Sequence, residues 1–402
     1  GTMCPSFRAT REESHTTRAR ANTLRELITH PRTKKIYDQR EILEVLDTCV
    51  SCKACKSECP SNVDIARFKA EFLQQHYDVC GVPMKAFLIA RLTEIQRLGT
   101  ILPWFYNAIV RNRMTGNMLK RILHCAPKRT IPTLYKTTLK HWLGRYRRKN
   151  RGETVGKVFL FADEFTNYMD VEIGIKMIEL LDWLGYEVII PKHVESGRTS
   201  ISKGMLKVAK GVARENVLLL KDLVTENIPL VGIEPSCILS FRDEYPDLVG
   251  EDLKEEAVRL GKNCLLYDEF FTREIRAGRI QAEQFTDQPL KIMLHGHCHQ
   301  KSLASVEPSR EMLSLPVNYS VEVIPSGCCG MAGAFGYEKK HYELSMKIGE
   351  QVLFPAVRGA GENVCISAPG TSCRQQIKDG TGKQALHPIE VLYEALKCTK
   401  EK

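Results

Sequence analysis

The residues best suited to chemistry are four cysteines between positions 49 and 59. They are Cys49, Cys52, Cys55 and Cys59, and Pro60 follows the last of them. Spacings of two residues let three thiolates converge from one tight loop on three corners of a cube of iron and sulfide, and the proline turns the chain away. The run therefore predicts a [4Fe–4S] cluster. Structural zinc is the weaker interpretation, because zinc sites usually join two separated cysteine pairs.

A fifth cysteine, Cys4, stands directly before a proline at the extreme N-terminus of the sequence. In proteins with two such clusters, the fourth cysteine of each run binds the other cluster. Cys4 therefore has the form of the end of a second run that lies upstream of residue 1. We predict that Cys4 completes the cluster of the first three cysteines, and that Cys59 serves a cluster that this chain does not assemble alone. An unrelated terminal thiol at position 4 is the open alternative.

A second group of cysteines lies in the last third of the sequence, and each member follows an expected β-strand: Cys298, Cys328, Cys329 and Cys373. Adjacent cysteines need the backbone freedom that the flanking Gly327 and Gly330 supply. Ligands of open α/β sheets bind at the carboxyl ends of strands. The group predicts a metal–thiolate site, with an iron–sulfur cluster ahead of zinc, and a reactive dithiol or buried core cysteines as open alternatives.

Other potential ligands carry weaker signals. Histidines at positions 295, 297 and 299 alternate around Cys298, and such residues more often support a site by hydrogen bonding than bind the metal. The remaining thiols have no ligand spacing and are expected to be core or surface residues: Cys80, Cys125, Cys264, Cys365 and Cys398.

Two kinds of secondary structure must position these cysteines. The first hundred residues are predicted to be helical, with apolar residues at helical spacing through 65–73 and a helix over 41–46 that runs into Cys49. From residue 158 onward, short apolar strands alternate with helices. The pattern predicts strands over 158–161 and 188–190, and between them a helix that stops at Gly185. This alternation is typical of α/β layering.

The α/β part contains an internal repeat. The segment from Lys157 aligns with that from Lys291, and Gly232–Cys237 aligns with Ala368–Cys373. In the first copy, Asp163 stands in place of Cys298 and Ser196-Gly197 stands in place of the cysteine pair, which leaves only Cys237. If the copies pack around a pseudo-twofold axis, Cys237 is predicted to face the second site as a fifth thiolate.

These patterns predict an α-helical ferredoxin-like domain followed by a duplicated α/β cysteine-rich (CCG) domain. A length of 402 residues accommodates several domains. The boundaries that we expect are a helical [4Fe–4S] ferredoxin-type domain over 1–95, a basic helical linker over 96–152, a first degenerate CCG half over 153–284 and a second CCG half with the cysteine site over 285–402.

Positive charge is concentrated in the expected linker. The net charge is +10, and residues 111–151 contain thirteen Lys or Arg and no Asp or Glu. Prolines and glycines interrupt this stretch, as in a linker or docking arm. A solvated connector, a surface for an acidic partner domain and contact with anionic lipid stay open. Nucleic-acid binding is not expected, because the sequence has no nucleic-acid motif.

The location of the protein is predicted from its N-terminus and its apolar segments. The N-terminal run is polar and has no signal-peptide core, so fifteen cysteines indicate metal-bound thiolates in a reducing cytoplasm rather than disulfides. The apolar run over 101–110 is about half the length that a membrane span needs. We expect a cytoplasmic protein without a transmembrane span, and we leave open a peripheral contact with the inner face of the membrane.

The sequence resembles the cysteine-rich CCG family, which includes heterodisulfide reductase subunits, the C subunit of anaerobic glycerol-3-phosphate dehydrogenase and lactate-utilisation iron–sulfur proteins. A narrower resemblance, to the C-terminal half of FAD-linked D-2-hydroxyacid dehydrogenases of the D-lactate or D-2-hydroxyglutarate type, covers nearly the whole chain. It rests on Cys4-Pro-Ser-Phe-Arg-Ala-Thr-Arg-Glu-Glu, Cys52-Lys-Ala-Cys-Lys-Ser-Glu-Cys-Pro, Glu234-Pro-Ser-Cys and Gly327-Cys-Cys-Gly-Met-Ala-Gly. It departs at Gly370, where heterodisulfide reductase has the first cysteine of a Cys-x-x-Cys pair.

The resemblance implies an oxidoreductase. In those enzymes a flavin domain precedes the first ferredoxin motif, so we expect the iron–sulfur half of a longer protein, with FAD on an upstream domain or on a partner protein. Electrons from a D-2-hydroxy acid would pass through the clusters to a quinone, a cytochrome or a similar acceptor. No catalytic residue is predicted. Disulfide reduction at the cysteine pair and a zinc-stabilised binding module are the alternatives.

Overall fold

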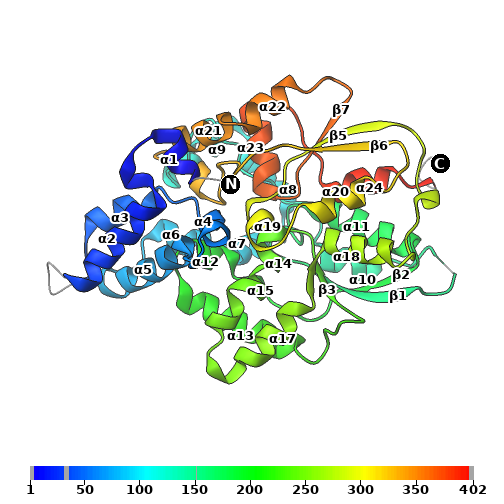
Figure 1. Cartoon of the computed structure of the whole chain (residues 1–402), viewed down its shortest axis with the longest axis horizontal. Coiled ribbons are helices and arrows are strands. Elements are labelled where there is room, and N and C mark those ends of the chain that lie inside the picture. The colour runs from blue at the N-terminus through cyan, green and yellow to red at the C-terminus, as the bar shows by residue number, and fades with distance from the viewer. Residues whose placement is uncertain (1–3, 31–35, 151, 398–402) are drawn as a thin grey trace.

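A helical N-terminal part and an α/β body make up the computed structural model of this chain, which describes residues 4–30, 36–150 and 152–397. The N-terminal helices, in blue, lie on one side of the α/β body, whose first half is green and whose second half runs from yellow to red (Figure 1). No helix in these ranges has both the length and the apolar character needed to cross a bilayer.

The N-terminal part is helical, as the sequence predicts. Its helices are α1 (Pro5–Thr10), α2 (Thr17–Thr29), α3 (Arg40–Asp47), α4 (Ala54–Glu58) and α5 (Ile65–Cys80), with the 3₁₀ turn η1 (Glu13–His15) after α1. The Asp64 side chain starts α5 by accepting the backbone N–H of Arg67. Four buried apolar side chains from α2, α3 and α5 pack together: Leu27, Ile42, Leu46 and Phe72.

The basic segment contains helices of its own. They are α8 (Pro103–Arg111), α9 (Arg113–Ile122) and α10 (Leu139–Arg145), and they follow α6 (Met84–Ala90) and α7 (Leu92–Gly99), of which α7 crosses the expected boundary after residue 95. The segment is not solvated throughout. The guanidinium of Arg129 is fully buried and donates hydrogen bonds to Gly336 O and Ser345 Oγ, both at 2.8 Å. Leu139 of α10 belongs to the main apolar core, so this part of the segment is anchored on the α/β body.

The first sheet has four parallel strands in the order β2-β1-β3-β4. The strands are β1 (Gly156–Phe161), β2 (Tyr186–Ile189), β3 (Leu230–Gly232) and β4 (Cys264–Leu266). The helices are α11 (Val171–Trp183), α12 (Arg198–Ser202), α13 (Leu206–Leu220), α14 (Pro235–Ile238), α15 (Ser240–Asp243), α16 (Tyr245–Leu248), α17 (Lys254–Lys262) and α18 (Tyr267–Arg276), and η2 (Glu251–Leu253) precedes α17. The predicted strand–helix–strand order is confirmed, and Gly185 makes the turn between α11 and β2 at a φ of 91°.

The second sheet has three parallel strands in the order β6-β5-β7. They are β5 (Leu290–Leu294), β6 (Tyr319–Val323) and β7 (Val364–Ser367). The helices are α19 (Cys298–Leu303), α20 (Glu307–Leu313), α21 (Tyr342–Glu350), α22 (Leu353–Gly359), α23 (Thr371–Thr381) and α24 (Pro388–Glu394), and the 3₁₀ turns are η3 (Ala282–Gln284) and η4 (Phe335–Tyr337).

The two sheets share an apolar core and an order of strands. In each sheet the first strand is central and lies between the second and the third. Buried residues from both sheets, among them Leu160 of β1 and Ile292 of β5, belong to one core cluster. The predicted α/β layering is therefore confirmed, and the carboxyl ends of the central strands are the places to look for a site.

Candidate metal centres

The first cysteine run lies between α3 and α5. Cys49 and Cys52 are on the loop after α3, as predicted, whereas Cys55 lies inside the short helix α4. Two residues of this loop, Ser51 and Lys53, have left-handed backbones with φ angles of 49° and 61°. Such conformations are uncommon for residues with a Cβ and mark a tightly turned loop.

Cys4 joins the first three cysteines of this run. Burial raises the pKa values of Cys52 and Cys55, and nearby thiolate charge, including that of Cys49 and Cys4, raises them further. The Arg20 guanidinium holds Cys4 by donating to its Sγ at 3.1 Å. Cys59 instead ends α4, between the exposed residues Glu58 and Pro60.

The distances between these sulfur atoms distinguish a single zinc ion from an iron–sulfur cluster. A tetrahedral zinc site, with Zn–S bonds of about 2.3 Å, brings its sulfurs to roughly 3.8 Å from one another. In residues 4–30, 36–150 and 152–397, three groups have all their ligand atoms within 4.8 Å of one another, and none of them contains a cysteine of this run or Cys4. The four thiols are gathered yet more widely spaced than one ion requires, so they fit a cluster better than zinc.

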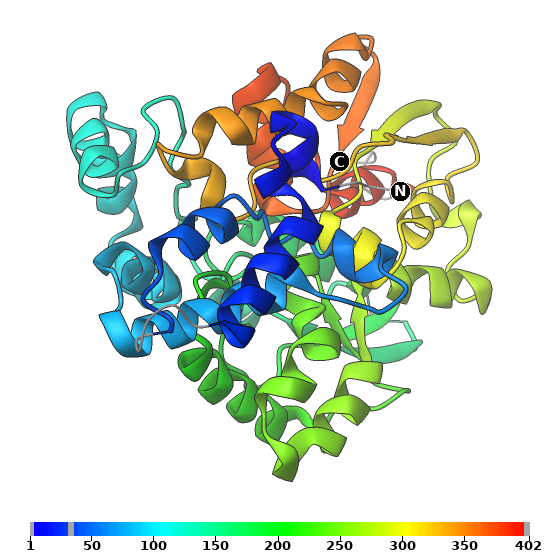
Figure 2. The same ribbon diagram turned by 60° about the vertical axis from the view of Figure 1, so that its left-hand side comes forward.

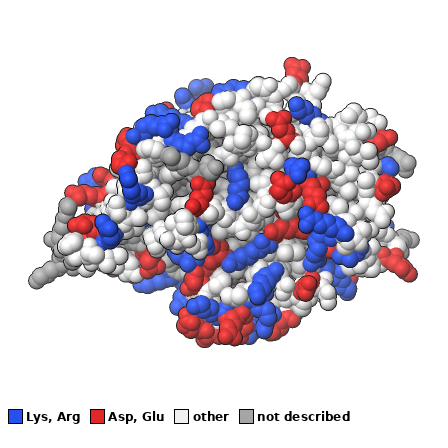
Figure 3. All heavy atoms as spheres, in the orientation of Figure 1, with Lys and Arg blue, Asp and Glu red and all other residues white. Residues whose placement is uncertain are grey.

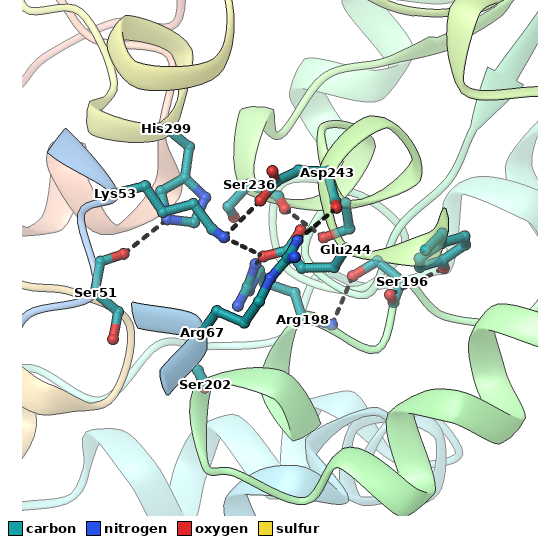
Figure 4. A network of polar contacts seen from close by, with 12 residues as sticks. Ser51, Lys53, Arg67, Ser196, Arg198, Ser202, Ser236, Asp243, Glu244 and His299 are labelled. Carbon is teal, nitrogen blue, oxygen red and sulfur yellow. Dashed lines mark hydrogen bonds and ion pairs between the residues drawn. The ribbon is translucent and has the colours of Figure 1, made fainter. Parts of the chain in front are cut away.

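A buried ion-pair network holds the loop against the α/β body (Figure 4). Lys53 Nζ lies 2.9 Å from Asp64 Oδ2, 2.5 Å from Asp243 Oδ2 and 3.2 Å from Glu244 Oε1. Burial alone would lower the pKa of Lys53, but the three carboxylates outweigh it and raise that pKa. Arg198 of α12 pairs with the same Glu244 at 2.5 Å. The charges are therefore mutually compensated, as buried charges must be.

The second group of cysteines converges at the carboxyl edge of the second sheet, as predicted. Cys298 begins α19 after β5, Cys328 and Cys329 follow β6, and Cys373 lies in α23 after β7. Gly330 makes the turn after the pair with a φ of 93°, and a Cβ there would lie 2.3 Å from Ser345 O. The glycine is therefore required by close packing as well as by its backbone angle.

Gly370 explains why one cysteine of the heterodisulfide reductase pattern is absent. A Cβ at position 370 would lie 2.5 Å from His297 Cδ2 and 3.2 Å from Cys373 Sγ. A side chain does not fit there without displacing the His297 ring.

The four thiols of the second site interact in sequence, from Cys298 to Cys328, then Cys329, then Cys373. The hydrogen bond from Cys328 lowers the pKa of Cys298 to about 6, and the nearby His297 and Lys301 act in the same direction. Hydrogen bonds from Cys328 and Cys373 lower the pKa of Cys329 well below its ordinary value. The same hydrogen bonds raise the pKa values of the donors Cys328 and Cys373, so Cys298 and Cys329 are the two thiols that the site favours as thiolates, the form in which cysteine binds metals.

His295 stands out from the other two histidines near this site. One ring nitrogen of His295 lies within 4.8 Å of the Sγ atoms of Cys329 and Cys373. Its Nδ1 contacts Ser326 Oγ at 2.7 Å, and its buried Nε2 has no hydrogen-bond partner among the described residues. Burial lowers the pKa of His295 to about 4, so the ring is neutral, as a metal ligand must be. The residues present therefore fit a metal.

The other two histidines support the loops around the site by hydrogen bonding. His297 Nδ1 accepts the backbone N–H of His299 at 3.2 Å, which starts α19. His299 Nε2 contacts Ser51 O at 3.0 Å, across to the first cysteine run.

Cys237 lies in a different group from the second-site thiols. Its Sγ and the carboxylates of Asp163 and Glu164 are within 4.8 Å of one another. Glu164 also accepts hydrogen bonds from the backbone and the hydroxyl of Ser196, at 2.9 and 2.7 Å. Counted from the aligned Lys157 and Lys291, the counterpart of Cys298 is Glu164 rather than the predicted Asp163, and Glu164 lies with Ser196 and Cys237 near the carboxyl edge of the first sheet. Burial, followed by the charge of Glu164, raises the pKa of Asp163 to about 8.

Glu234 links the two groups, a role that sequence reasoning did not assign although the residue opens the Glu234-Pro-Ser-Cys motif. Its Oε1 lies 3.8 Å from His297 Nε2, and its Oε2 accepts the backbone N–H of Thr371 at 2.9 Å. Its position directly before Pro235 and two residues after β3 was the available signal.

The remaining thiols fall on varied positions. Cys264 is buried in β4, Cys125 and Cys365 are half-buried, and Cys398 lies outside the described residues. Cys80 is exposed at the end of α5, within 4.8 Å of ligand atoms of Asp38 and His76.

The two cysteine groups lie next to each other. The charge of Cys298 raises the pKa of Cys52, after the effect of burial. Ser302 Oγ of α19 donates to Cys52 O at 3.1 Å. An apolar cluster spans the contact: Val50, Cys52, Cys328, Phe335 and Ile348. Two candidate metal centres thus share one water-poor boundary, which the sequence did not predict.

Comparison with known proteins agrees with this geometry. Residues 2–64 match a family model described as a 4Fe-4S dicluster domain. Over 98% of its length the chain is 25% identical to D-2-hydroxyglutarate dehydrogenase of Escherichia coli (strain K12), of which it covers 42%. It is 26% identical to the C subunit of anaerobic glycerol-3-phosphate dehydrogenase of the same strain, and that alignment covers 84% of this chain and 83% of the subunit. It is also 26% identical to lactate utilization protein A of Exiguobacterium sp., over 59% of this chain and 94% of that protein.

These likenesses confirm the predicted iron–sulfur character: residues 2–64 match a 4Fe-4S domain, and the chain is similar to dehydrogenases and to a dehydrogenase subunit. The expected resemblance to hydroxyacid dehydrogenases, to the glycerol-3-phosphate dehydrogenase component and to lactate-utilisation proteins is confirmed with it. The chain spans less than half the length of the hydroxyglutarate dehydrogenases that it matches.

Proposed function

We propose that the chain is the electron-transfer half of a flavin-linked oxidoreductase. It receives electrons from an FAD domain or partner protein that oxidises a D-2-hydroxy acid, and passes them to a quinone or cytochrome-type acceptor. The observation that carries the proposal is the packing of both cysteine groups in one apolar cluster, in which Cys52 and Cys328 are buried and against which Cys298 packs. Similarity to dehydrogenases supports the donor side of the proposal.

The ligands follow from the two groups of thiols. Cys4, Cys49, Cys52 and Cys55 hold a [4Fe–4S] cluster, and Cys59 is left for a cluster completed by residues outside this chain. The second centre is bound by Cys298, Cys328, Cys329 and Cys373, with His295 beside them, as an iron–sulfur cluster or, in second place, as zinc. We keep Cys237 as a remnant ligand position of the first half.

The domain division follows the same scheme. We propose a ferredoxin-type domain over 1–95, a basic linker over 96–152, and two CCG halves over 153–284 and 285–402 that arose by duplication. The same order of the first three strands in both sheets, and the gathering of Glu164, Ser196 and Cys237 at the aligned positions, support the duplication.

The side chains of this protein have three tasks in electron transfer. When bound, the clusters accept and release one electron at a time. Lys53 and its carboxylates fix the first cysteine run against α15, and Ser302 of α19 holds the same run by donating to Cys52 O. The apolar cluster around Val50 and Phe335 excludes water between the centres, and lower local polarity affects their potentials. Arg20 Nη1 donates to Cys4 Sγ at 3.1 Å and so fixes the position of this sulfur.

A second candidate function is thiol–disulfide chemistry at the same cysteines. It is favoured by the pKa of Cys298, which is lowered to about 6 beside the Cys328 thiol. A thiolate next to a thiol is the arrangement that disulfide exchange uses.

The test is anaerobic reconstitution, followed by counts of iron, sulfide and zinc and by EPR spectra. It compares wild type, Cys49→Ser and Cys328→Ser with Cys365→Ser, a half-buried thiol that we assign to no metal. We expect each ligand variant to lose the metal of its own centre only, and the control to match wild type. An unchanged iron count and spectrum in Cys49→Ser would refute the proposal. Zinc at the second centre, or metal-free turnover of a disulfide, would reassign that centre.

A further inference from the structure

The helices α8 and α9 carry an exposed apolar surface that neither cysteine site uses. Residues 84–122 contain eleven of the twenty-two large apolar side chains that are exposed in the described part of the chain. We define the α8–α9 surface by Trp104, Phe105, Met114, Met118 and Ile122, whose side chains are between 52% and 83% exposed. Such a concentration on a folded protein marks an interaction site.

Each of these two helices carries exposed apolar side chains of its own. Met114, Met118 and Ile122 recur every four residues and so form a stripe along α9. Trp104 and Phe105 of α8 contact each other edge to face, with ring centroids 5.8 Å apart. The helices pack against each other, and Figure 2 shows them in cyan at the periphery of the molecule. The exposed stripe of α9 is therefore accessible to an external partner.

The charge around the α8–α9 surface has one sign. Residues 84–122 contain seven Lys or Arg and only Glu94 as an acid, which gives a net charge of +6. Arg111, Arg113 and Arg121 are exposed on or beside the two helices. The face drawn in Figure 3 differs, because Lys and Arg are interspersed there with Asp and Glu.

We propose that the α8–α9 surface docks on a lipid bilayer that contains anionic lipids, with both helices lying in the plane of the membrane interface. Apolar side chains that include a tryptophan, bordered by arginines, are the composition of helices that lie at such an interface. The arginines match the negative head groups of anionic lipids, and the apolar stripe leaves water for the acyl boundary. Docking depends on this surface alone, so it is independent of the metal content of the cysteine sites.

The experiment is flotation of the full-length reconstituted protein with vesicles of phosphatidylcholine alone or with about 30% phosphatidylglycerol. We expect binding to the anionic vesicles, weakened by high salt because exposed charges are screened. Trp104→Ser/Met118→Ser should lower the vesicle affinity by about tenfold or more, since each side chain gives up apolar burial. Arg113→Glu/Arg121→Glu should lower affinity similarly and remove most of the salt dependence.

Matched controls change exposed residues elsewhere. Leu218→Ser/Val317→Ser removes apolar side chains that are 54% and 74% exposed, and Lys210→Glu/Lys262→Glu reverses exposed charges on α13 and α17. Both should bind vesicles like wild type, and unchanged melting temperatures and iron counts show that all variants fold. The proposal is overturned if wild type does not float with anionic vesicles, or if the α8–α9 variants float like the controls. It is also overturned if the wild type is a dimer that the Trp104/Met118 variant splits without loss of lipid binding.

Discussion

Lys53 and Asp243 form a buried ion pair across 190 positions of sequence, with Nζ 2.5 Å from Oδ2. Their side chains are 2% and 4% exposed. Lys53 directly follows Cys52, and Asp243 ends α15 of the first α/β half. The pair therefore joins the first cysteine run to the body that carries the second site.

Asp243→Asn should destabilise the protein strongly. The substitution leaves Lys53 and Lys56 facing a neutral amide inside the interface, and loss of one partner of a buried pair costs about 3–5 kcal/mol in unfolding free energy. Chemical denaturation checks this. The double variant Lys53→Met/Asp243→Leu should lose less than the sum of the two single variants. Glu13→Gln, which breaks the exposed Arg18 pair, is the control and should change nothing measurable.

Cys4→Ser and Cys59→Ser should differ in iron content. Cys4 lies with Cys49, Cys52 and Cys55, whereas Cys59 lies beyond them at the end of α4. We expect Cys4→Ser to lose or convert the first cluster and Cys59→Ser to keep the wild-type iron count after reconstitution. Iron and sulfide analysis with EPR measures both. Equal loss in the two variants would place Cys59 in the same cluster as the other three cysteines of its run.

The two centres should interact magnetically when both are reduced. The charge of Cys298 reaches Cys52, and one apolar cluster spans the boundary between them. If the second centre is an iron–sulfur cluster, the EPR signal of the reduced wild type should be broadened by spin coupling. Cys328→Ser, which removes the second centre, should narrow the signal of the first. A spectrum that is the same in both proteins would argue against two paramagnetic centres in contact.

Asp163→Asn should change the pH dependence of stability. Burial raises the pKa of Asp163 to about 8 in the folded protein, from an ordinary value of 3.8. Because the folded form holds its proton longer, wild-type stability falls between about pH 4 and 8, by at most about 1.4 kcal/mol per pH unit. An asparagine cannot ionise, and its Oδ1 can still accept the N–H groups of Phe165 and Thr166.

The measurement for Asp163 is the melting temperature of both proteins from pH 5 to 8.5. The advantage of Asp163→Asn over wild type should grow as the pH rises to about 8 and then level off. Thr225→Val, a change on a loop of the same half, serves as a pH-independent control. A constant difference across this range would mean that Asp163 is already ionised in the folded protein.

The sequence was sufficient where chemistry is local. The spacing of Cys49, Cys52 and Cys55 predicted one loop, and the apolar pattern around residues 158–190 predicted β1, α11 and β2. Contacts between distant residues were not predictable in this way. Nothing near Lys53 indicates that its partner is Asp243, and the burial of Arg129 depends on carbonyl and hydroxyl groups more than two hundred positions away. The separate placement of Cys237 depends on how the two sheets pack.

The packing of Cys52 and Cys298 in one apolar cluster also bears on the dynamics of the proposed relay. Many redox proteins carry electrons on a domain that swings between docking sites, so their turnover is limited by diffusion of that domain. Here buried charges and a shared apolar cluster fix the two centres against each other. Electron transfer between the two centres should therefore be a tunnelling step across a constant distance. Its rate should not depend on the viscosity of the solvent.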